Sequence, residues 1–158
     1  MQTHDTLPPL DAWTASIRKT DGEALAQSAP FAAVRLARAL EQASRRGSAR
    51  LALVSMYDIE NNAVRVLAAS LRRAGHFCLE IYFKDWRNNH LDWPEEAELE
   101  HLCRILRDEQ IDMVGFSIRA SAYYKVTRHL TETVHRQLDL AVLWGGNHPT
   151  LVPDRCIP

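Results

Sequence analysis

The sequence predicts an α/β domain in which a parallel β-sheet lies between layers of helices. From residue 50 onward, short runs of branched and aromatic residues alternate with helical patterns, as in βαβ units. These runs are mostly apolar rather than alternately polar, as expected for strands that helices cover on both faces. The 158 residues are enough for one domain with a substantial core.

Four segments have the pattern of buried strands, and three helical patterns separate them. Strands are predicted at residues 51–56, 77–83, 112–118 and 140–146. Helices are predicted at residues 62–75, 94–109 and 121–138. Right-handed crossovers between parallel strands place helices on both faces of such a sheet. The fold class predicted is therefore a flavodoxin-like (Rossmann-like) three-layer sandwich with strand order 2-1-3-4.

Local signals mark the ends of these helices. Asn61 or Asn62 can cap the first helix, and Gly75 can end it. Pro94, with acidic residues directly after it, suits the first turn of the second helix. The intervening segment 84–94 is predicted to be a long polar loop.

The first 48 residues are predicted to form an N-terminal helical extension, and residues 49–158 the α/β domain. The extension is rich in alanine and contains no run typical of a strand. One helix is expected at about residues 30–46 and a shorter one near residues 10–28.

Composition excludes several classes of function. The net charge of −1 offers no electropositive surface for nucleic acid. No apolar stretch approaches the ~20 residues of a membrane span, and the N-terminus lacks the features of a signal peptide. Cys78, Cys103 and Cys156 are far apart and form no metal-binding spacing. We therefore expect a cytoplasmic protein with no membrane or nucleic-acid partner and no metal bound by its side chains alone.

Three loops follow the first, third and fourth predicted strands, at residues 57–62, 119–121 and 145–150. Because the strands are parallel, their carboxyl ends share one edge of the sheet, where ligands of open α/β folds bind. No GxGxxG, GxxxxGK[ST] or GxSxG motif is present. Asp58 would suit a phospho-receiver domain, but Ser117 stands where such a domain needs a second Asp.

Several residues of these loops have two interpretations. Gly145 and Gly146 either form a turn that needs positive φ or let a ligand approach the backbone. Ser117 either satisfies a local backbone group or hydrogen-bonds a ligand. Of Tyr123 and Tyr124, one is expected to pack on the sheet, while the other meets solvent or forms a wall for a flat ligand.

A family resemblance is carried by the segments "LVSMYDIENNAVRVLAASLRRAGH", "IDMVGFSIRASAYYKVTRHLTETV" and "LWGGNHPTLVPD". Together they resemble the N-terminal cobalamin-binding domain of cobalamin (vitamin B12)-dependent radical S-adenosyl-L-methionine (SAM) enzymes. That family includes methyltransferases and the anaerobic cyclase of bacteriochlorophyll synthesis. The resemblance covers about residues 50–155, and its most specific part is the GGxHPT element.

The wider cobalamin-binding fold has an Asp-x-His-x-x-Gly motif after the first strand, whose His is the lower ligand of cobalt. In this chain the three signature positions are Ser55, Tyr57 and Glu60. Neutral tyrosine is a poor ligand for cobalt. Radical enzymes of the family commonly lack the His, so the resemblance implies a corrinoid held without a protein His ligand.

The resemblance also implies which residues hold the cofactor. The loop after the first strand would lie under the corrin, and the other two loops would line a groove for the nucleotide tail. The implied cofactor-binding residues are Tyr57, Asp58, Ile59, Glu60, Asn61, Asn62, Ser117, Ile118, Arg119, Ala120, Ser121, Gly145, Gly146, Asn147, His148, Pro149 and Thr150. No catalytic residue and no protein metal ligand is assigned among them.

The family's catalytic domain follows this module and holds a 4Fe-4S cluster, through CxxxCxxC, and S-adenosylmethionine. This chain has no such motif, and the fifth strand expected of the fold is also missing. We therefore expect a C-terminally truncated fragment whose partner is the downstream radical SAM domain of its parent chain, with no catalysis by the fragment alone. Two rivals remain: a degenerate, cofactor-free scaffold module, and a domain that binds another nucleotide at the same edge.

Overall fold

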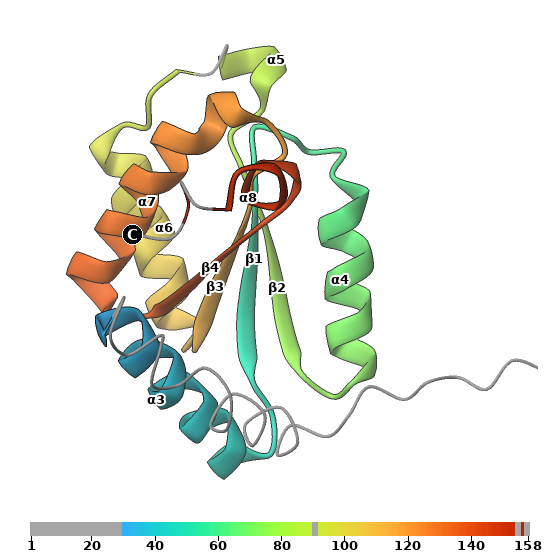
Figure 1. The fold of residues 1–158 in the computed structure, drawn as a ribbon, viewed down its shortest axis with the longest axis vertical. Helices are drawn as coiled ribbons and strands as arrows, with labels where there is room; N and C mark the ends of the chain where they lie inside the picture. The colour runs from blue at the N-terminus through green and yellow to red at the C-terminus, as the bar shows by residue number, and fades with distance from the viewer. Residues whose placement is uncertain (1–29, 90–91, 154–155, 157–158) are drawn as a thin grey trace, which may run out of the picture.

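Four parallel strands form one sheet in the order β2-β1-β3-β4 (Figure 1). They are β1 (Arg50–Met56), β2 (Phe77–Phe83), β3 (Met113–Ser117) and β4 (Ala141–Gly145). The structure is a computed structural model that describes residues 30–89, 92–153 and 156. Each predicted strand is present within a residue or two of its expected bounds. The predicted strand order and flavodoxin-like fold class are confirmed.

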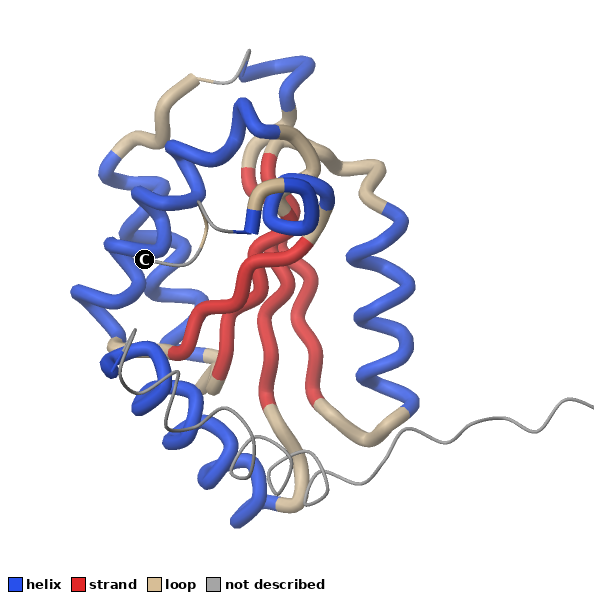
Figure 2. The backbone as a smooth tube through the Cα atoms, viewed as in Figure 1, coloured by secondary structure: helices blue, strands red, loops and turns tan. Residues whose placement is uncertain are grey.

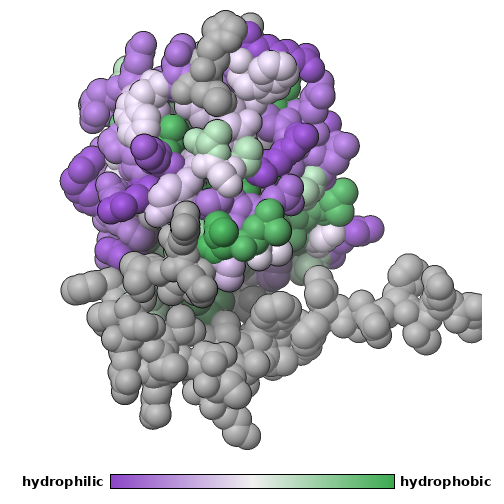
Figure 3. All heavy atoms as spheres, turned by 45° about the horizontal axis from the view of Figure 1, so that its top comes forward, coloured by the Kyte–Doolittle hydropathy of each residue, from purple (hydrophilic) through white to green (hydrophobic). Residues whose placement is uncertain are grey.

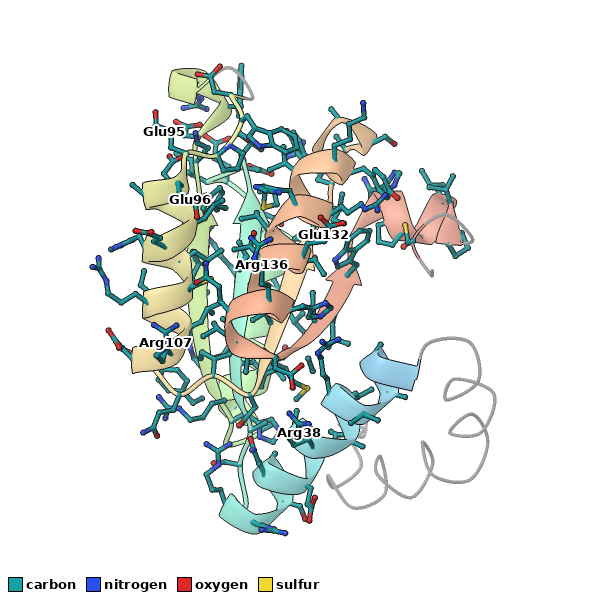
Figure 4. All side chains as sticks on the ribbon, turned by 90° about the vertical axis from the view of Figure 1, so that its left-hand side faces the viewer. Arg38, Glu95, Glu96, Arg107, Glu132 and Arg136 are labelled. Atoms are coloured by element: carbon teal, nitrogen blue, oxygen red, sulfur yellow. The ribbon has the colours of Figure 1, made fainter. Side chains whose placement is uncertain are left out.

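Helices cover both faces of this sheet, which gives the three layers (Figure 2). One face carries α6 (Glu96–Asp108) and α7 (Tyr124–Leu138), and the other carries α3 (Pro30–Arg46) and α4 (Asn62–Arg73). Figure 4 shows α6 and α7 side by side in front of the strands. Of the described helices, none is long and apolar enough to cross a membrane.

The core follows from the alternation of side chains along each strand. Val54 and Phe116 point to the α6–α7 face and lie in the main cluster of buried residues, together with Leu130 of α7. Leu53 points to the opposite face and packs in a separate cluster with Val64 of α4. Both faces of the central strands are therefore buried, which explains why their sequences are mostly apolar.

Helix α3 packs on the sheet through small side chains. Ala39 and Ala43 are buried against Met113 and Ala141, at the amino ends of β3 and β4. The buried Asp112 carboxylate accepts hydrogen bonds from the Arg46 side chain and the Arg50 backbone N–H, which anchors the end of α3. The division of the chain at residue 48 stays a prediction, and the helix expected near residues 10–28 lies outside the described residues.

Three short helices were not predicted. The polar connection after β2 contains α5 (Trp86–Asn89), and the segment after Gly146 forms α8 (Asn147–Leu151). The third crossover helix begins as a separate 3-10 turn, η1 (Ser121–Tyr123). Such short helices depend on their surroundings, because a single turn has little helical stability of its own.

The ends of α6 match the charges that a helix dipole favours. Glu95 is the N-cap residue in a capping box, in which the Glu98 side chain accepts the Glu95 backbone N–H at 2.8 Å. Arg107 lies in the last turn, at the opposite end of the helix from Glu95 and Glu96 (Figure 4). The predicted start near Pro94 is therefore one to two residues early.

The packing of α7 makes a prediction about stability. Leu130→Ala should lower the free energy of unfolding by roughly 2–5 kcal/mol, because it leaves a cavity in the fully buried main cluster. Val66→Ala, on the exposed side of α4, should change it by less than about 0.5 kcal/mol. Urea unfolding followed by circular dichroism measures both. Equal effects would mean that α7 is not packed as described.

Candidate functional site

Ser55, Ser117 and Gly145 form the last row of residues across the carboxyl edge of the central strands. Ser55 of β1 is the Cα partner of Ser117 in β3, and Ser117 is the partner of Gly145 in β4. Alternation along the strands points their Cα–Cβ directions to the face that carries α3 and α4. Strand order reverses between β1 and β3, so this row crosses the topological switch point of the sheet.

The Asn61 side chain joins the two serines of this row. Its Nδ2 donates to Ser55 Oγ and to Ser117 Oγ, each at 3.0 Å. Its Oδ1 accepts the Val64 backbone N–H at 3.3 Å, which makes Asn61 the N-cap of α4 as predicted. Ser117 is therefore engaged by a side chain from a different loop, and not by a local backbone group.

Gly145 and Gly146 have different surroundings. One interpretation, a turn that needs positive φ, fits Gly146, and the other, room for a ligand beside the backbone, fits Gly145. Gly146 has φ +98°, and a Cβ at this position would lie 2.9 Å from the carbonyl oxygen of Ile118. The turn conformation and the chain's own backbone therefore account for Gly146. A Cβ at Gly145 would meet no atom within 4 Å, so the space beside Gly145 is open.

The open space beside Gly145 belongs to an uncovered part of the sheet, which we call the open strip (Ser117, Leu143 and Gly145). Leu143 is 44% exposed, whereas Ala141 at the other end of β4 is buried by α3. Arg65 and Arg72 of α4 donate hydrogen bonds to residues of β2. Helical spacing therefore places the exposed Leu67 on the opposite side of α4, which faces β3. The strip is thus polar at the sheet edge and apolar below it.

Tyr57 follows β1 but does not face this strip. Its φ of +56° turns the side chain into the core, where it is fully buried. The hydroxyl donates to the carbonyl oxygen of Asp92 at 2.6 Å, and the ring centroid lies 5.3 Å from that of Tyr123. Burial, with smaller contributions from Glu98 and Asp92, raises the pKa of Tyr57 to about 12. The phenol is therefore neutral and already hydrogen-bonded.

An ion pair joins the loops that follow β1 and β3. Arg119 Nη1 lies 2.6 Å from Asp58 Oδ2, and the other Asp58 oxygen accepts the Glu60 backbone N–H at 3.0 Å. The hydrogen bond and charge of Asp58 raise the pKa of Arg119 above its already high value. The Asp58 side chain is 8% exposed, whereas that of Arg119 is 65% exposed.

The connection after β2 contributes to the same edge of the sheet, which the sequence analysis missed. The Trp86 backbone N–H donates to the Tyr57 carbonyl at 3.2 Å, and Arg87 pairs with Glu60 at 2.7 Å. Ile59, Trp86 and Trp93 are 39%, 53% and 53% exposed, on an end of the molecule that is otherwise mostly hydrophilic (Figure 3). Two tryptophans in a polar connection were the signal that could have found this surface.

His148, in the first turn of α8, has its side chain buried in a small aromatic cluster. Its Nδ1 is 2.9 Å from Ser121 Oγ, and its backbone N–H donates to Ile118. Its buried Nε2 has no hydrogen-bond partner in the described part of the chain. The Tyr124 ring contacts both His148 and Trp144, with centroids 5.2 Å and 5.8 Å away. Tyr124 is thus part of this cluster, while Tyr123 packs on Tyr57.

The other residues assigned to the site occupy its periphery. Asn62, Asn147 and Thr150 are exposed, and Ala120 and Pro149 are half-buried. Thr150 Oγ1 donates to the Gly146 carbonyl at 2.9 Å, within the turn that starts α8. Within residues 30–89, 92–153 and 156, no three His, Cys, Asp or Glu side chains gather to form a metal site.

The two glycines make a testable prediction. Gly146→Ala should lower the free energy of unfolding by roughly 1–3 kcal/mol, because a side chain is strained at positive φ and clashes with Ile118. Gly145→Ala is the matched control and should change it by less than about 0.5 kcal/mol. Chemical unfolding of both variants measures the difference. Equal stabilities would remove the structural role assigned to Gly146.

Tyr57 makes a prediction about alkaline pH. The folded chain keeps the phenol proton up to about 12, whereas the unfolded chain loses it near 10.0, so the free energy of unfolding should fall across this interval. Tyr57→Phe lacks the titrating group and should lose less stability between these pH values, although it is less stable at neutral pH. Tyr82→Phe serves as the control and should show the full alkaline loss. Urea unfolding at a series of pH values measures all three, and parallel losses would contradict the burial of Tyr57.

Comparison with known proteins gives one match. No curated protein and no solved structure matches the chain. The model of the family described as "B12 binding domain" matches residues 50–158, which include all four strands and every loop of the carboxyl edge. This match spans well over half of the sequence and agrees with the fold class and the order of the strands. The chain therefore belongs to the B12-binding domain family.

Proposed function

We propose that this chain holds cobalamin at the carboxyl edge of its sheet, without a histidine ligand from the protein, as a module of a B12-dependent radical SAM enzyme. The observation that carries the proposal is the open strip beside α4. An extended nucleotide tail needs an uncovered path along the sheet, and Gly145 leaves that path free. The polar row at its top and the apolar Leu67 and Leu143 below suit a ligand with a polar backbone and a flat base.

The surface proposed to meet the corrin is formed by the loop after β1 and by α5. Ile59 and Trp86 supply exposed apolar area beside the charged Glu60 and Arg87. The state of Tyr57 supports a cobalt without a ligand from the protein, because the Tyr57 hydroxyl is buried, neutral and hydrogen-bonded to the Asp92 carbonyl. Its contribution is to fix the loop, whereas Ile59 and Asn62 are placed to touch the cofactor.

When bound, cobalamin would supply the methyl-carrying or redox chemistry of its cobalt. The residues of this chain would bind and orient it: Ser117 and Gly145 along the tail, and the loop after β1 under the ring. The GGNHPT segment supports a radical SAM parent, whose 4Fe-4S cluster and S-adenosylmethionine would belong to a downstream domain in the cytoplasm. Within that assembly this module would position the cofactor and would not itself be catalytic.

A second function, a cofactor-free scaffold, is favoured by one observation. The three signature positions of the cobalt-ligand motif carry Ser55, Tyr57 and Glu60, and each of these side chains makes a contact within the protein. A scaffold would keep those contacts and would have no use for an open strip. Retention of cobalamin therefore distinguishes the two functions.

The test is to mix the protein with hydroxocobalamin, desalt it and record the visible spectrum. Wild type should retain the corrin absorbance. Gly145→Leu should weaken binding at least tenfold, because a side chain whose Cβ meets no atom of the protein would extend into the open strip. Ala69→Leu adds the same bulk on an exposed position of α4 and should bind as wild type does. No retained colour in wild type would leave the scaffold function.

A further inference from the structure

The ion pair between Asp58 and Arg119 lies at the mouth of a crevice, and its two side chains differ strongly in exposure. An ion pair that only stabilised the surface would need neither feature. The two residues extend the loops that begin just after Ser55 and Ser117, so the pair spans the mouth of the β1–β3 crevice. Ion pairs with a mostly exposed partner such as Arg119 (65% exposed) contribute little to stability when they lie at a surface, with a median near 0–1 kcal/mol. Its place above the polar row therefore needs another explanation.

The two partners are held very differently. Asp58 is buried and keeps a second hydrogen bond, from the Glu60 backbone N–H at 3.0 Å, so its carboxylate is fixed in place. Arg119 is mostly exposed, and its guanidinium has five N–H donors. Arg119 can therefore take a second anion, or exchange partners, while Asp58 stays where it is.

Arg119 is also the cation of the proposed cofactor loops. In the described residues 57–62, 118–123 and 145–151, Arg119 is the single arginine or lysine, beside the acidic Asp58 and Glu60. A ligand with a negative group that enters the crevice between these loops would meet the carboxylates of Asp58 and Glu60 and the guanidinium of Arg119, while Arg87 of α5 pairs with Glu60. Guanidinium groups bind phosphate through short, charge-assisted hydrogen bonds.

We propose that Arg119 is the counter-ion of the phosphate in the nucleotide tail, and that its ion pair with Asp58 is a latch which this phosphate opens. The inference rests on the proposed function and assigns to one residue the recognition of the tail, as distinct from the ring. In the ligand-free state Asp58 holds Arg119 across the crevice. On binding, the phosphate takes over Arg119, and Asp58 keeps its bond to the Glu60 N–H.

Substitutions of Arg119 and Asp58 should then change the affinity for cobalamin in opposite directions. Arg119→Gln should weaken cobalamin binding about tenfold, since it removes a charge-assisted hydrogen bond and leaves Asp58 unpaired near the phosphate. Asp58→Asn can still accept the Glu60 N–H but no longer competes for Arg119, so it should bind cobalamin severalfold more tightly. Arg45→Gln removes an exposed cation that pairs with Glu41 on α3, outside the carboxyl edge of the sheet, and should leave the affinity unchanged.

Cobinamide isolates the nucleotide tail that carries the phosphate, because it has the same corrin ring without the nucleotide or its phosphate. Dissociation constants for cobalamin and cobinamide should be measured by equilibrium dialysis with absorbance detection, for wild type and the three variants. Arg119→Gln and Asp58→Asn should change the dissociation constant for cobalamin and leave that for cobinamide unchanged. The dissociation constant of wild type for cobalamin should depend more steeply on salt than that of Arg119→Gln.

The outcomes separate this inference from the function on which it rests. If wild type binds cobalamin but Arg119→Gln binds it equally well, or loses both corrinoids alike, Arg119 does not recognise the phosphate, and cobalamin binding itself still stands. If Asp58→Asn binds cobalamin more weakly than wild type, the latch is wrong. If wild type binds neither corrinoid, both the inference and the proposed function fail.

Discussion

The carboxyl edge of this fold depends on the side chain of one buried asparagine. Asn61 caps α4 with its oxygen and holds Ser55 and Ser117 with its nitrogen, so one amide joins a helix to both central strands. A buried amide satisfied at both ends is an economical solution, because an unpaired polar group at this depth is costly. The loop between β1 and α4 is consequently held on the crevice side by hydrogen bonds in place of apolar packing.

Tyr57 holds the other side of that loop, mainly through the packing of a buried aromatic ring. The ring is buried against Tyr123, and the hydroxyl reaches past the sheet to the chain before α6. Between these two anchors lie Asp58, Ile59 and Glu60, of which Ile59 and Glu60 are exposed. A loop fixed at both ends presents a short surface whose shape changes little, which suits the holding of a rigid ring.

The sequence predicted the large elements because each is long enough to show its period. Apolar runs marked the strands, and the position of Asn61 before an amphipathic pattern marked the cap. The two glycines could not be told apart, because the difference between them is the backbone of Ile118, which lies far away in the sequence. For the same reason the burial of Tyr57 was not visible: it depends on a positive φ and on partners in two other segments. Short helices such as α5 carry too few residues to show a pattern.

The burial of Tyr57 also limits what a histidine at this position could do. A histidine at this position would have to leave the core to face a ligand, and its ring ends well before the place of the phenol oxygen. The Asp92 carbonyl would lose its donor, and Tyr123 would lose the ring against which it packs. A single mutation of Tyr57 to histidine would therefore loosen the loop before it could supply a ligand. Tyr57 holds the loop through contacts that a histidine could not keep while it faced a ligand.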